Sequence, residues 1–312
     1  MKKDFVQQLK GTVAIVSHDM PDGDAIGSCN AIYLALKELK IESQIIFKNK
    51  IPQKYDFLNI PYKLYNSDME FDNLIILDTQ ELSLLKDVEP LIKKTKKIFV
   101  IDHHPKSSNT ISKAEYYVFN DKSCTAQIIA EMFLGTISSV SFLESVYTAI
   151  LYDTDGFSNS NVNEPLFSLC SKLCEKGLKP ANIYKKIILQ KSFNEIKLIG
   201  STLTGIELFK KGKIVVAITT YKMFSDYGIN PLFCPSIFNN IKGCLCAQIF
   251  VHIKELKKCE YKISLRSEKI DVRQIAKIFD GGGHKKAAGF KMKGSLEDVK
   301  KSSLDCIKGY LT

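Results

Sequence analysis

The sequence predicts an α/β protein, with a doubly wound parallel-sheet domain followed by a smaller α+β domain. In the first half, short apolar runs alternate with amphipathic helical patterns, as in βαβ units. In the second half, three strand patterns and two helical patterns indicate an α+β unit. The length of 312 residues also suits two domains. We expect these domains at 1–190 and 211–312, joined by a linker helix at 191–210.

Short apolar runs mark the strands of the first domain. Runs of this kind are typical of parallel strands that are buried on both faces. Helical patterns separate or follow them, and Ser123 is predicted as the N-cap of one helix. The expected strands are 13–16, 44–47, 74–77 and 98–101, and the expected helices are 25–39, 123–134 and 142–151.

A long helical pattern at 192–209 is expected to lead out of the first domain. The chain beyond it shows no internal repeat and no low-complexity segment. Here the expected strands are 214–219, 245–252 and 261–266, and the expected helices are 272–279 and 296–310.

Composition argues against several classes of protein. With 45% hydrophobic and 25% charged residues, the chain fits neither a disordered nor a fibrous protein. A mean hydropathy of −0.05, with no apolar run near the ~20 residues of a membrane span, argues against a membrane protein. The polar first ten residues do not resemble a signal peptide, so the nine cysteines indicate reduced thiols used for packing. We therefore expect a cytoplasmic location.

The positive charge is concentrated in the last third of the chain. Residues 207–312 carry 20 Lys and Arg against 10 Asp and Glu, whereas residues 1–206 carry 24 of each sign. The whole net charge of +10 therefore belongs to the second part. Either an anionic partner or a solvated lysine-rich face would explain this asymmetry.

Acids and histidines follow three of the four strands predicted in the first domain. In open α/β sheets, ligands bind beyond the carboxyl ends of the strands, where these side chains would meet. A single Asp after a strand is most often a turn former, but converging carboxylates and imidazoles suit a divalent cation. Three of the five histidines lie at these strand ends, so we predict a metal site. The residues concerned are His18, Asp19, Asp22, Asp24, Asp78, Asp102, His103 and His104, with Asp153 at a helix end.

These segments together resemble the DHH phosphoesterase superfamily, in particular the compact subfamily in which a DHH domain precedes a DHH-associated domain. The resemblance spans residues 17–290, nearly the whole chain, and its motifs occur in family order. The motifs are SHDMPDGDAIGS at 17–28, the strand-end Asp78, DHHP at 102–105, DTDGF at 153–157, SLRS at 264–267 and GGGH at 281–284.

The resemblance implies two divalent metal ions, usually Mn²⁺ in this family, although the ligand types also fit Mg, Fe or Co. Asp78 would bridge the two ions. Asp102 would orient an imidazole and His104 would face the substrate phosphate, which makes Asp78, Asp102, His103 and His104 the catalytic group. The fourth motif has acids at both 153 and 155, and Asp153 is assigned because it precedes Thr. The implied ligands are His18, Asp22 and Asp78 for one ion, and Asp24, Asp78, His103 and Asp153 for the other.

Arginine is rare in the chain and occurs only at 266 and 273, against 42 lysines. Strand alternation places Ser264 and Arg266 on one face, and a guanidinium can bind phosphate through two hydrogen bonds. A surface ion pair is the alternative for Arg266. The resemblance implies that Arg266 and His284 hold the terminal phosphate or its nucleotide. The implied substrate-binding set is His104, Ser264, Arg266, Ser267, Gly281, Gly282, Gly283 and His284.

The glycine run before His284 can aim backbone N–H groups at an anion if residues 285–288 open a short helix. A flexible loop is the alternative. Asp280 stands where many relatives of the resembled family have a fourth Gly. The remaining histidine, His252, lies on a predicted strand and is interpreted as structural.

The expected activity is hydrolysis of phosphate esters by a two-metal hydroxide mechanism, in a cleft between the domains. Length and motifs favour the NrnA-like nanoRNases, which degrade short oligoribonucleotides to nucleoside 5'-monophosphates and often dephosphorylate 3'-phosphoadenosine 5'-phosphate (pAp) to AMP. A stand-alone cyclic di-AMP or pApA phosphodiesterase is the alternative. An inactive nucleic-acid-binding scaffold is disfavoured because no implied ligand is missing. The expected partners are short RNA oligonucleotides and small nucleotides, with no membrane and no protein partner, and a homodimer is compatible with the sequence.

Overall fold

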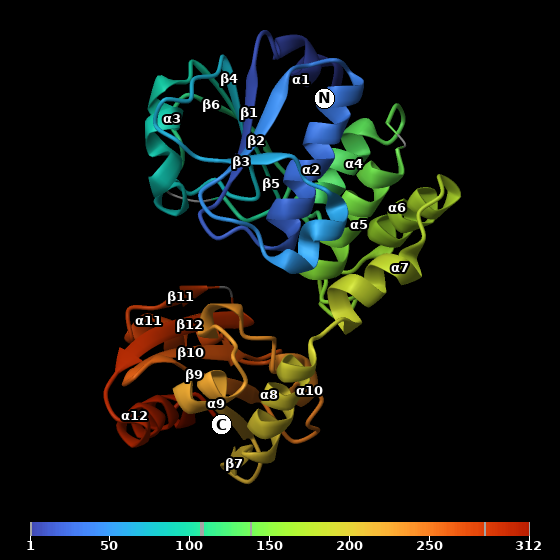
Figure 1. Cartoon of the computed structure of the whole chain (residues 1–312). Coiled ribbons are helices and arrows are strands. Elements are labelled where there is room, and N and C mark those ends of the chain that lie inside the picture. The colour runs from blue at the N-terminus through green and yellow to red at the C-terminus, as the bar shows by residue number, and fades with distance from the viewer. Residues whose placement is uncertain (1, 107–108, 138, 284, 312) are drawn as a thin grey trace. The chain divides into compact units, whose positions relative to one another are not determined.

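The computed structural model describes residues 2–106, 109–137, 139–283 and 285–311. The chain forms two compact units, Met1–Gln190 and Lys191–Thr312 (Figure 1). Each unit contains one six-stranded sheet. The described helices include none that is long and apolar enough to cross a membrane.

The first sheet is parallel throughout and has the order β3-β2-β1-β4-β5-β6. The predicted doubly wound parallel sheet is therefore confirmed. The strands β3 and β6 were not predicted, because both are edge strands whose half-exposed residues do not form a continuous apolar run. The bounds are β1 Val13–Ser17, β2 Ser43–Phe47, β3 Tyr62–Leu64, β4 Asn73–Leu77, β5 Lys97–Asp102 and β6 Ala114–Val118.

Helices cover both faces of the first sheet (Figure 1). Side chains such as Ile15 and Ile75 pack with α1, α2, α4 and α5 on one face, and Val16 and Ile76 pack with α3 on the other. Successive strand residues point to opposite faces, which explains why these strands are apolar at every position. The bounds are α1 Lys2–Gln8, α2 Gly23–Glu38, α3 Glu89–Lys94, α4 Thr125–Phe133, α5 Val140–Asp153, α6 Glu164–Glu175 and α7 Pro180–Tyr184.

The strand order reverses between β1 and β4, because β2 and β3 lie on one side of β1 while β5 and β6 lie beyond β4. At such a switch point the connections after the two central strands diverge and leave a crevice at the carboxyl edge. The segments after β1, β4 and β5 all reach this edge. It is therefore the part of the first unit best suited to bind a ligand.

The second sheet has the order β11-β12-β10-β9-β8-β7 and is antiparallel except for the parallel β8–β9 pair. The helices α11 and α12 pack on one face, and α8 and α10 pack on the other. The strands are β7 Glu207–Phe209, β8 Ile214–Thr219, β9 Ile249–Lys257, β10 Glu260–Arg266, β11 Gly282–Gly283 and β12 Ala287–Lys293. The helices are α8 Phe193–Thr204, α9 Tyr221–Asp226, α10 Phe238–Ile241, α11 Val272–Ile278 and α12 Leu296–Lys308.

Several predicted element bounds in the second unit are wrong. The helix predicted at 192–209 ends at Thr204, and β7 follows it. The strand predicted at 245–252 begins only at Ile249, since Leu245 is 99% exposed and cannot serve as a buried strand residue. Residues 285–288 open no helix, because β12 begins at Ala287 and pairs with β10.

The predicted N-cap Ser123 is also wrong. Cys124 occupies the N-cap position of α4 without a side-chain cap. The Ser123 hydroxyl donates instead to the carbonyl oxygen of Asn161, at 2.6 Å. The Ser123 hydroxyl therefore binds the carbonyl of a residue distant in sequence and does not cap the helix that follows it.

Candidate metal centre

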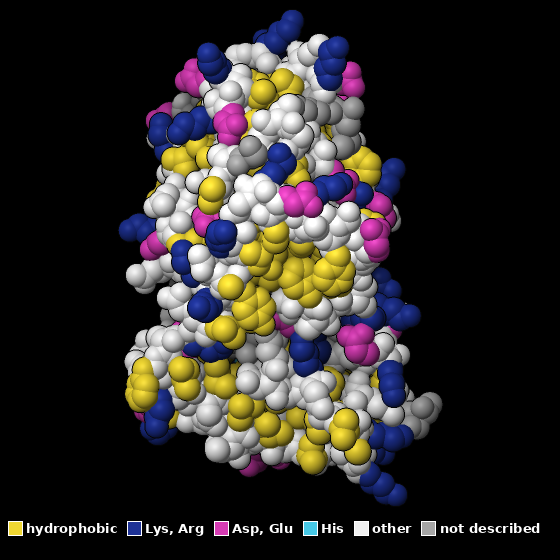
Figure 2. Space-filling view, turned by 90° about the vertical axis from the view of Figure 1, so that its right-hand side faces the viewer, with side chains coloured by type: hydrophobic (Ala, Val, Ile, Leu, Met, Phe, Trp, Pro, Cys, Tyr) yellow, Lys and Arg dark blue, Asp and Glu magenta, His cyan; other side chains and the backbone are white. Residues whose placement is uncertain are grey.

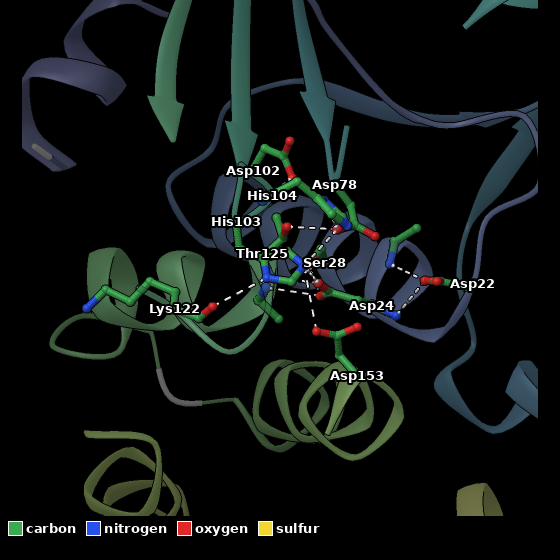
Figure 3. A network of polar contacts seen from close by, with 12 residues as sticks. Asp22, Asp24, Ser28, Asp78, Asp102, His103, His104, Lys122, Thr125 and Asp153 are labelled. Atoms are coloured by element: carbon green, nitrogen blue, oxygen red, sulfur yellow. Dashed lines mark hydrogen bonds and ion pairs between the residues drawn. The ribbon is translucent and has the colours of Figure 1, made fainter. Parts of the chain in front are cut away.

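Acidic and imidazole side chains gather at the carboxyl edge of the first sheet (Figure 3). His18 follows β1, Asp78 follows β4, and Asp102 is the last residue of β5. Three groups of side chains each bring possible ligand atoms within 4.8 Å of one another. These groups are His18, Asp22 and Asp78; Asp78, His103 and His104; and Asp24, His103 and Asp153.

Asp78 lies between the other ligands and belongs to two of these groups. Its Oδ2 atom is 3.8 Å from His18 Nε2, and its Oδ1 atom is 3.7 Å from His103 Nε2. The residue is 4% exposed and has a φ of 62°, a left-handed conformation that costs a non-glycine residue ~1–3 kcal/mol. Thr125 holds the carboxylate by donating from Oγ1 to Oδ1 at 3.0 Å. The two oxygens of Asp78 therefore face two different sets of possible ligands.

Asp24 is held at the N-termini of two helices. It lies in the first turn of α2, and its Oδ2 atom accepts a hydrogen bond from the Thr125 backbone N–H of α4 at 2.7 Å. Its Oδ1 atom accepts from Ser28 Oγ at 2.9 Å and from the Ala126 N–H at 3.2 Å. Helix N-termini favour negative charge. These hydrogen bonds and the two helix N-termini thus stabilise the buried Asp24 carboxylate.

Asp22 is the N-cap of α2, and its Oδ1 atom accepts from the backbone N–H groups of Asp24 and Ala25. This cap fixes where the helix begins. It leaves the other carboxylate oxygen of Asp22 for a ligand role beside His18 and Asp78.

His103 provides the test of whether the cluster fits a metal ion. Its Nδ1 atom lies 3.3 Å from the Lys122 carbonyl oxygen, to which it donates, so Nε2 carries a lone pair. That Nε2 atom is buried and has no hydrogen-bond partner among the described residues. It lies 3.6 Å from Asp153 Oδ2, 3.7 Å from Asp78 Oδ1 and 3.8 Å from Asp24 Oδ2. An acceptor nitrogen that faces three carboxylates at these distances fits a cation held between them.

The electrostatics of the cluster also favour a cation. Burial raises the pKa of Asp78 well above its ordinary value, and the carboxylates of Asp24 and Asp22 raise it further. Burial likewise raises the pKa of Asp153 to about 8, again with contributions from Asp24 and Asp22. Burial lowers the pKa of His103, which keeps its imidazole neutral. Close carboxylates repel one another, and bound cations would relieve that repulsion.

Asp102 and His104 form a hydrogen-bonded pair beside the cluster. The Asp102 side chain is fully buried, and its Oδ1 atom accepts from His104 Nδ1 at 2.7 Å. Its Oδ2 atom accepts from Gln80 Nε2 at 3.1 Å. Burial acts to raise the pKa of Asp102, but the hydrogen bond and charge of His104 outweigh it, and the pKa is lowered. Burial acts to lower the pKa of His104, but Asp102 outweighs it, and the pKa is raised.

Asp153 and Asp155 differ in their surroundings. Asp153 ends α5 and reaches His103, and Asn161 Nδ2 donates to its Oδ2 atom at 3.4 Å. Asp155 has a φ of 47°, and its Oδ2 atom accepts from Ser158 Oγ at 3.2 Å. Asp155 belongs to none of the three ligand groups among the described residues.

Several residues that position the ligands were not predicted from the sequence. Ser28, Gln80, Thr125 and Asn161 each donate to a carboxylate of the cluster, and Lys122 contributes only its carbonyl oxygen. A contact through a backbone carbonyl cannot be predicted from residue type, because every residue has one. Thr125 begins α4, which follows the edge strand β6 and not a ligand-bearing strand, so its position along the chain does not indicate this contact.

The substrate-binding residues predicted in the second unit lie in one sheet or next to it, apart from His284, which is outside the described residues. Ser264 and Arg266 are on β10, Gly282 and Gly283 are on β11, and Ser267 and Gly281 adjoin these strands. Arg266 is exposed on β10, with its guanidinium 4.7 Å from the ring centroid of Phe238. Ser264 of β10 is opposite Gly289 of β12, which in turn pairs with Gly282. Gly281 and Gly283 flank Gly282, and Gly283 is paired with Ala288. The excess of Lys and Arg over Asp and Glu is visible on the molecular face in Figure 2.

Ser267 and His252 have buried polar groups that are hydrogen-bonded within the second unit. Ser267 Oγ donates to the Gln248 carbonyl at 2.6 Å and accepts from the Ile270 N–H at 2.9 Å. His252 Nε2 lies 2.9 Å from Thr219 Oγ1, and burial lowers its pKa to about 3. A neutral, hydrogen-bonded histidine in the core agrees with its structural interpretation.

Two family models match the chain. The one described as "DHH family, N-terminal domain" matches residues 12–151, and the one described as "DHHA1 domain" matches residues 212–311. The first range contains nearly all of the acidic and imidazole cluster, and Asp153 lies just beyond it. The second contains β8–β12.

Curated relatives and solved structures resemble the chain over nearly its full length. It is 25% identical to a Thermus thermophilus protein named "Bifunctional oligoribonuclease and PAP phosphatase NrnA", over 99% of this chain and 93% of that one. A Bacillus subtilis protein of the same name is 23% identical, over 93% and 92%. A crystal structure of an exopolyphosphatase-related protein from Bacteroides fragilis has the same fold, with a TM-score of 0.90, 22% identity and coverage of 99% and 96%.

Proposed function

The chain belongs to the DHH family, with a DHH domain followed by a DHHA1 domain, and we propose that it is a metal-dependent phosphoesterase of short nucleotides. Its substrates are short oligoribonucleotides, which it hydrolyses to nucleoside 5'-monophosphates, and pAp, which it dephosphorylates to AMP. The names of the relatives from T. thermophilus and B. subtilis support this choice of substrates.

The observation that carries the proposal is the position of Asp78, whose two oxygens face two sets of ligands. Divalent ions at such sites activate water at neutral pH and neutralise the charge that develops on phosphate oxygens. Mn²⁺ suits the mixture of imidazoles and carboxylates. The proposed ligands are His18, Asp22 and Asp78 for one ion, and Asp24, Asp78, His103 and Asp153 for the other.

Asp102 and His104 have a separate role in the proposed reaction. Because the Asp102 carboxylate binds Nδ1 of His104, the imidazole can offer the proton on Nε2 to a phosphate oxygen. Against the effect of burial, the hydrogen bond and charge of Asp102 raise the pKa of His104, which favours the imidazole that carries a proton on both nitrogens. The His104 side chain is 36% exposed, so a substrate can reach it.

In the DHHA1 domain, Arg266 and the glycines Gly281–Gly283 are proposed to bind a substrate phosphate, together with Ser264, Ser267 and His284. Arg266 is exposed, and its guanidinium is oriented by Phe238 and by the Leu265 carbonyl, to which Nη1 donates at 2.9 Å. A guanidinium oriented in this way can bind phosphate through two hydrogen bonds.

The experiment is product analysis with purified protein and Mn²⁺ on four separate substrates: a 5'-phosphorylated RNA dinucleotide, an RNA 20-mer, pAp and cyclic di-AMP. We expect rapid conversion of the dinucleotide and pAp to mononucleotides and slow conversion of the other two. Asp78→Asn should abolish turnover, whereas Asp155→Asn, which alters a nearby acid outside the ligand groups, should retain it. Preferential opening of cyclic di-AMP, or full activity of Asp78→Asn, would overturn the proposal.

A further inference from the structure

Three lysines lie side by side across neighbouring strands of the second sheet. Lys262 of β10 is opposite Lys254 of β9 on one side and opposite Lys291 of β12 on the other. Residues directly opposite each other in antiparallel strands project from the same face, with Cβ atoms ~5 Å apart. The three ammonium groups therefore form one row, here named the lysine row and defined as Lys254, Lys262 and Lys291.

Acidic side chains do not neutralise the lysine row. Lys254 Nζ donates to the Pro231 carbonyl at 2.9 Å, and in the described part of the chain neither Lys262 nor Lys291 is paired with a carboxylate. The nearest acid along β10, Glu260, is already bound to Lys293 at 2.9 Å. The hydrogen bond and charge of Lys293 lower the pKa of Glu260, and the charge of Lys291 also lowers it. Because this one acid is shared with Lys293, the row keeps an excess of positive charge.

This charge carries a cost in the folded protein. Burial lowers the pKa of Lys262, and the charges of Lys291 and Arg266 lower it further. Like charges directly opposite each other destabilise a sheet. A surface that keeps such charges together, with two of the three lysines exposed, is suited to an anion that lies across the strands.

The face beside the lysine row continues toward Arg266. Because strand side chains alternate, Lys262, Ser264 and Arg266 all project from the same face of β10. The position opposite Ser264 on β12 is Gly289, and the next strand has Gly282 there. On the other side of β10, the residue opposite Ser264 is His252 of β9, whose ring contacts Phe238. A ligand can therefore approach the backbone between the lysine row and Arg266 on the β12 side, where the sheet has glycines in place of side chains.

From this geometry we propose that the lysine row binds backbone phosphates of a linear polyanion that extends from Arg266 across the sheet. The inference rests on the proposed function, in which Arg266 binds a phosphate of the substrate. Four residues along the strand separate Lys262 from Arg266, or ~14 Å, about four times the ~3.4 Å axial rise per nucleotide of a stacked strand. The row therefore strengthens binding of ligands with several phosphates and does not contact a dinucleotide.

The test compares Lys262→Gln, and the variant with all three lysines changed to Gln, with the control Lys301→Gln. Lys301 is an exposed lysine on α12, which packs against the opposite face of the sheet. Binding of fluorescently labelled RNA dinucleotide and hexanucleotide is followed by anisotropy in EDTA, so that no turnover occurs. Unlabelled inorganic polyphosphate is added as a competitor, which separates the two sources of a linear polyanion.

We expect Lys262→Gln to raise the Kd of the hexanucleotide about fivefold to tenfold and the triple variant to raise it further. Each lysine lost should flatten the dependence of log Kd on log salt by ~0.7. The dinucleotide and Lys301→Gln should show no change. If polyphosphate displaces the hexanucleotide from the native protein but not from the triple variant, then polyphosphate is also a ligand of the lysine row.

Equal weakening of both RNAs by Lys262→Gln, or no effect on the hexanucleotide, would overturn the inference. A purely structural lysine would lower the thermal unfolding midpoint, whereas loss of one of three repelling charges should leave it equal or higher. Because binding is measured without turnover, the outcome is separate from that of the proposed function. If the protein hydrolyses dinucleotides but the triple variant binds the hexanucleotide as tightly as the native protein does, the proposed function stands and the inference is wrong.

Discussion

The two units use six-stranded sheets in opposite ways. In the first unit the candidate metal ligands lie at the edge of a parallel sheet, where buried acids such as Asp24 and Asp78 meet imidazoles. In the second unit the proposed phosphate-binding residues lie on the face of a largely antiparallel sheet, where exposed cations such as Lys262 and Lys291 stand on adjacent strands. The carboxyl edge of a parallel sheet can bring metal-ligating side chains from several strands around one small ion. The face of an antiparallel sheet can instead place cationic side chains along a linear polyanion.

The largest effects should come from the edge of the first sheet. His103→Ala removes a neutral nitrogen that faces three carboxylates, so we expect activity with Mn²⁺ to fall more than about 100-fold. Metal analysis of the purified variant should show fewer bound ions than in the native protein. If metal content and activity are unchanged, His103 is not a metal ligand, and the difference proposed between the two units is wrong.

A smaller effect should follow from Asp102→Asn, which changes how His104 is held without removing a proposed ligand. We expect kcat to fall about 10–100-fold. Without the carboxylate, the pKa of His104 should drop, so the decline of kcat with rising pH should begin at lower pH. A pH profile of kcat for both proteins measures this shift. A lower kcat with an unshifted profile would contradict the assignment of His104 as the proton donor.

The acid cluster should also make the metal-free protein sensitive to pH. The pKa of Asp153 is about 8 in the folded protein and ~3.9 when unfolded, so the folded state binds more protons and stability falls as pH rises. The lowered pKa values of His18 and His103 act in the opposite sense, but only below about pH 6.5. Between pH ~6.5 and ~8, the thermal midpoint in EDTA should therefore fall with rising pH. Mn²⁺ should remove this trend, and a midpoint that rises with pH in EDTA would refute it.

The smallest effect concerns the second unit, where Ser267 combines a proposed substrate role with a buried hydroxyl. Ser267→Ala leaves the Gln248 carbonyl and the Ile270 N–H without their partner, which should cost ~1–2 kcal/mol of unfolding free energy. Urea unfolding measures this loss, with the exposed Ser302→Ala on α12 as the control. If the two variants have equal free energies of unfolding, the segment after β10 does not depend on the Ser267 hydroxyl.

The first unit could be predicted further than the second for a physical reason. Strands buried on both faces are apolar at every position, and their carboxyl ends meet at one edge whatever the register of the pairing. Acids from Asp22 to Asp102 could therefore be assigned to one place from the sequence, whereas Asp153, at the end of a helix, is assigned through the family resemblance. The edge strands β3 and β6 escaped because half-exposed residues leave no such pattern.

The second unit depends on pairing that local sequence does not contain. Lys254 and Lys262 lie on the consecutive strands β9 and β10, but Lys291 is remote from both in the chain, and only the register of β10 with β9 and β12 puts the three in one row. The same holds for residues 285–288, where pairing of β12 with β10 replaces the expected helix. Backbone contacts such as the Lys122 carbonyl on His103 were equally invisible, because any residue type could supply them.

The most direct test of the central claim is anomalous diffraction from crystals of the protein grown with Mn²⁺. Two anomalous peaks ~3.5–4 Å apart, one beside each carboxylate oxygen of Asp78, would agree with the account. The first should adjoin His18 and Asp22, and the second should adjoin Asp24, His103 and Asp153. A single peak remote from Asp78, or no peak at this edge of the sheet, would contradict it.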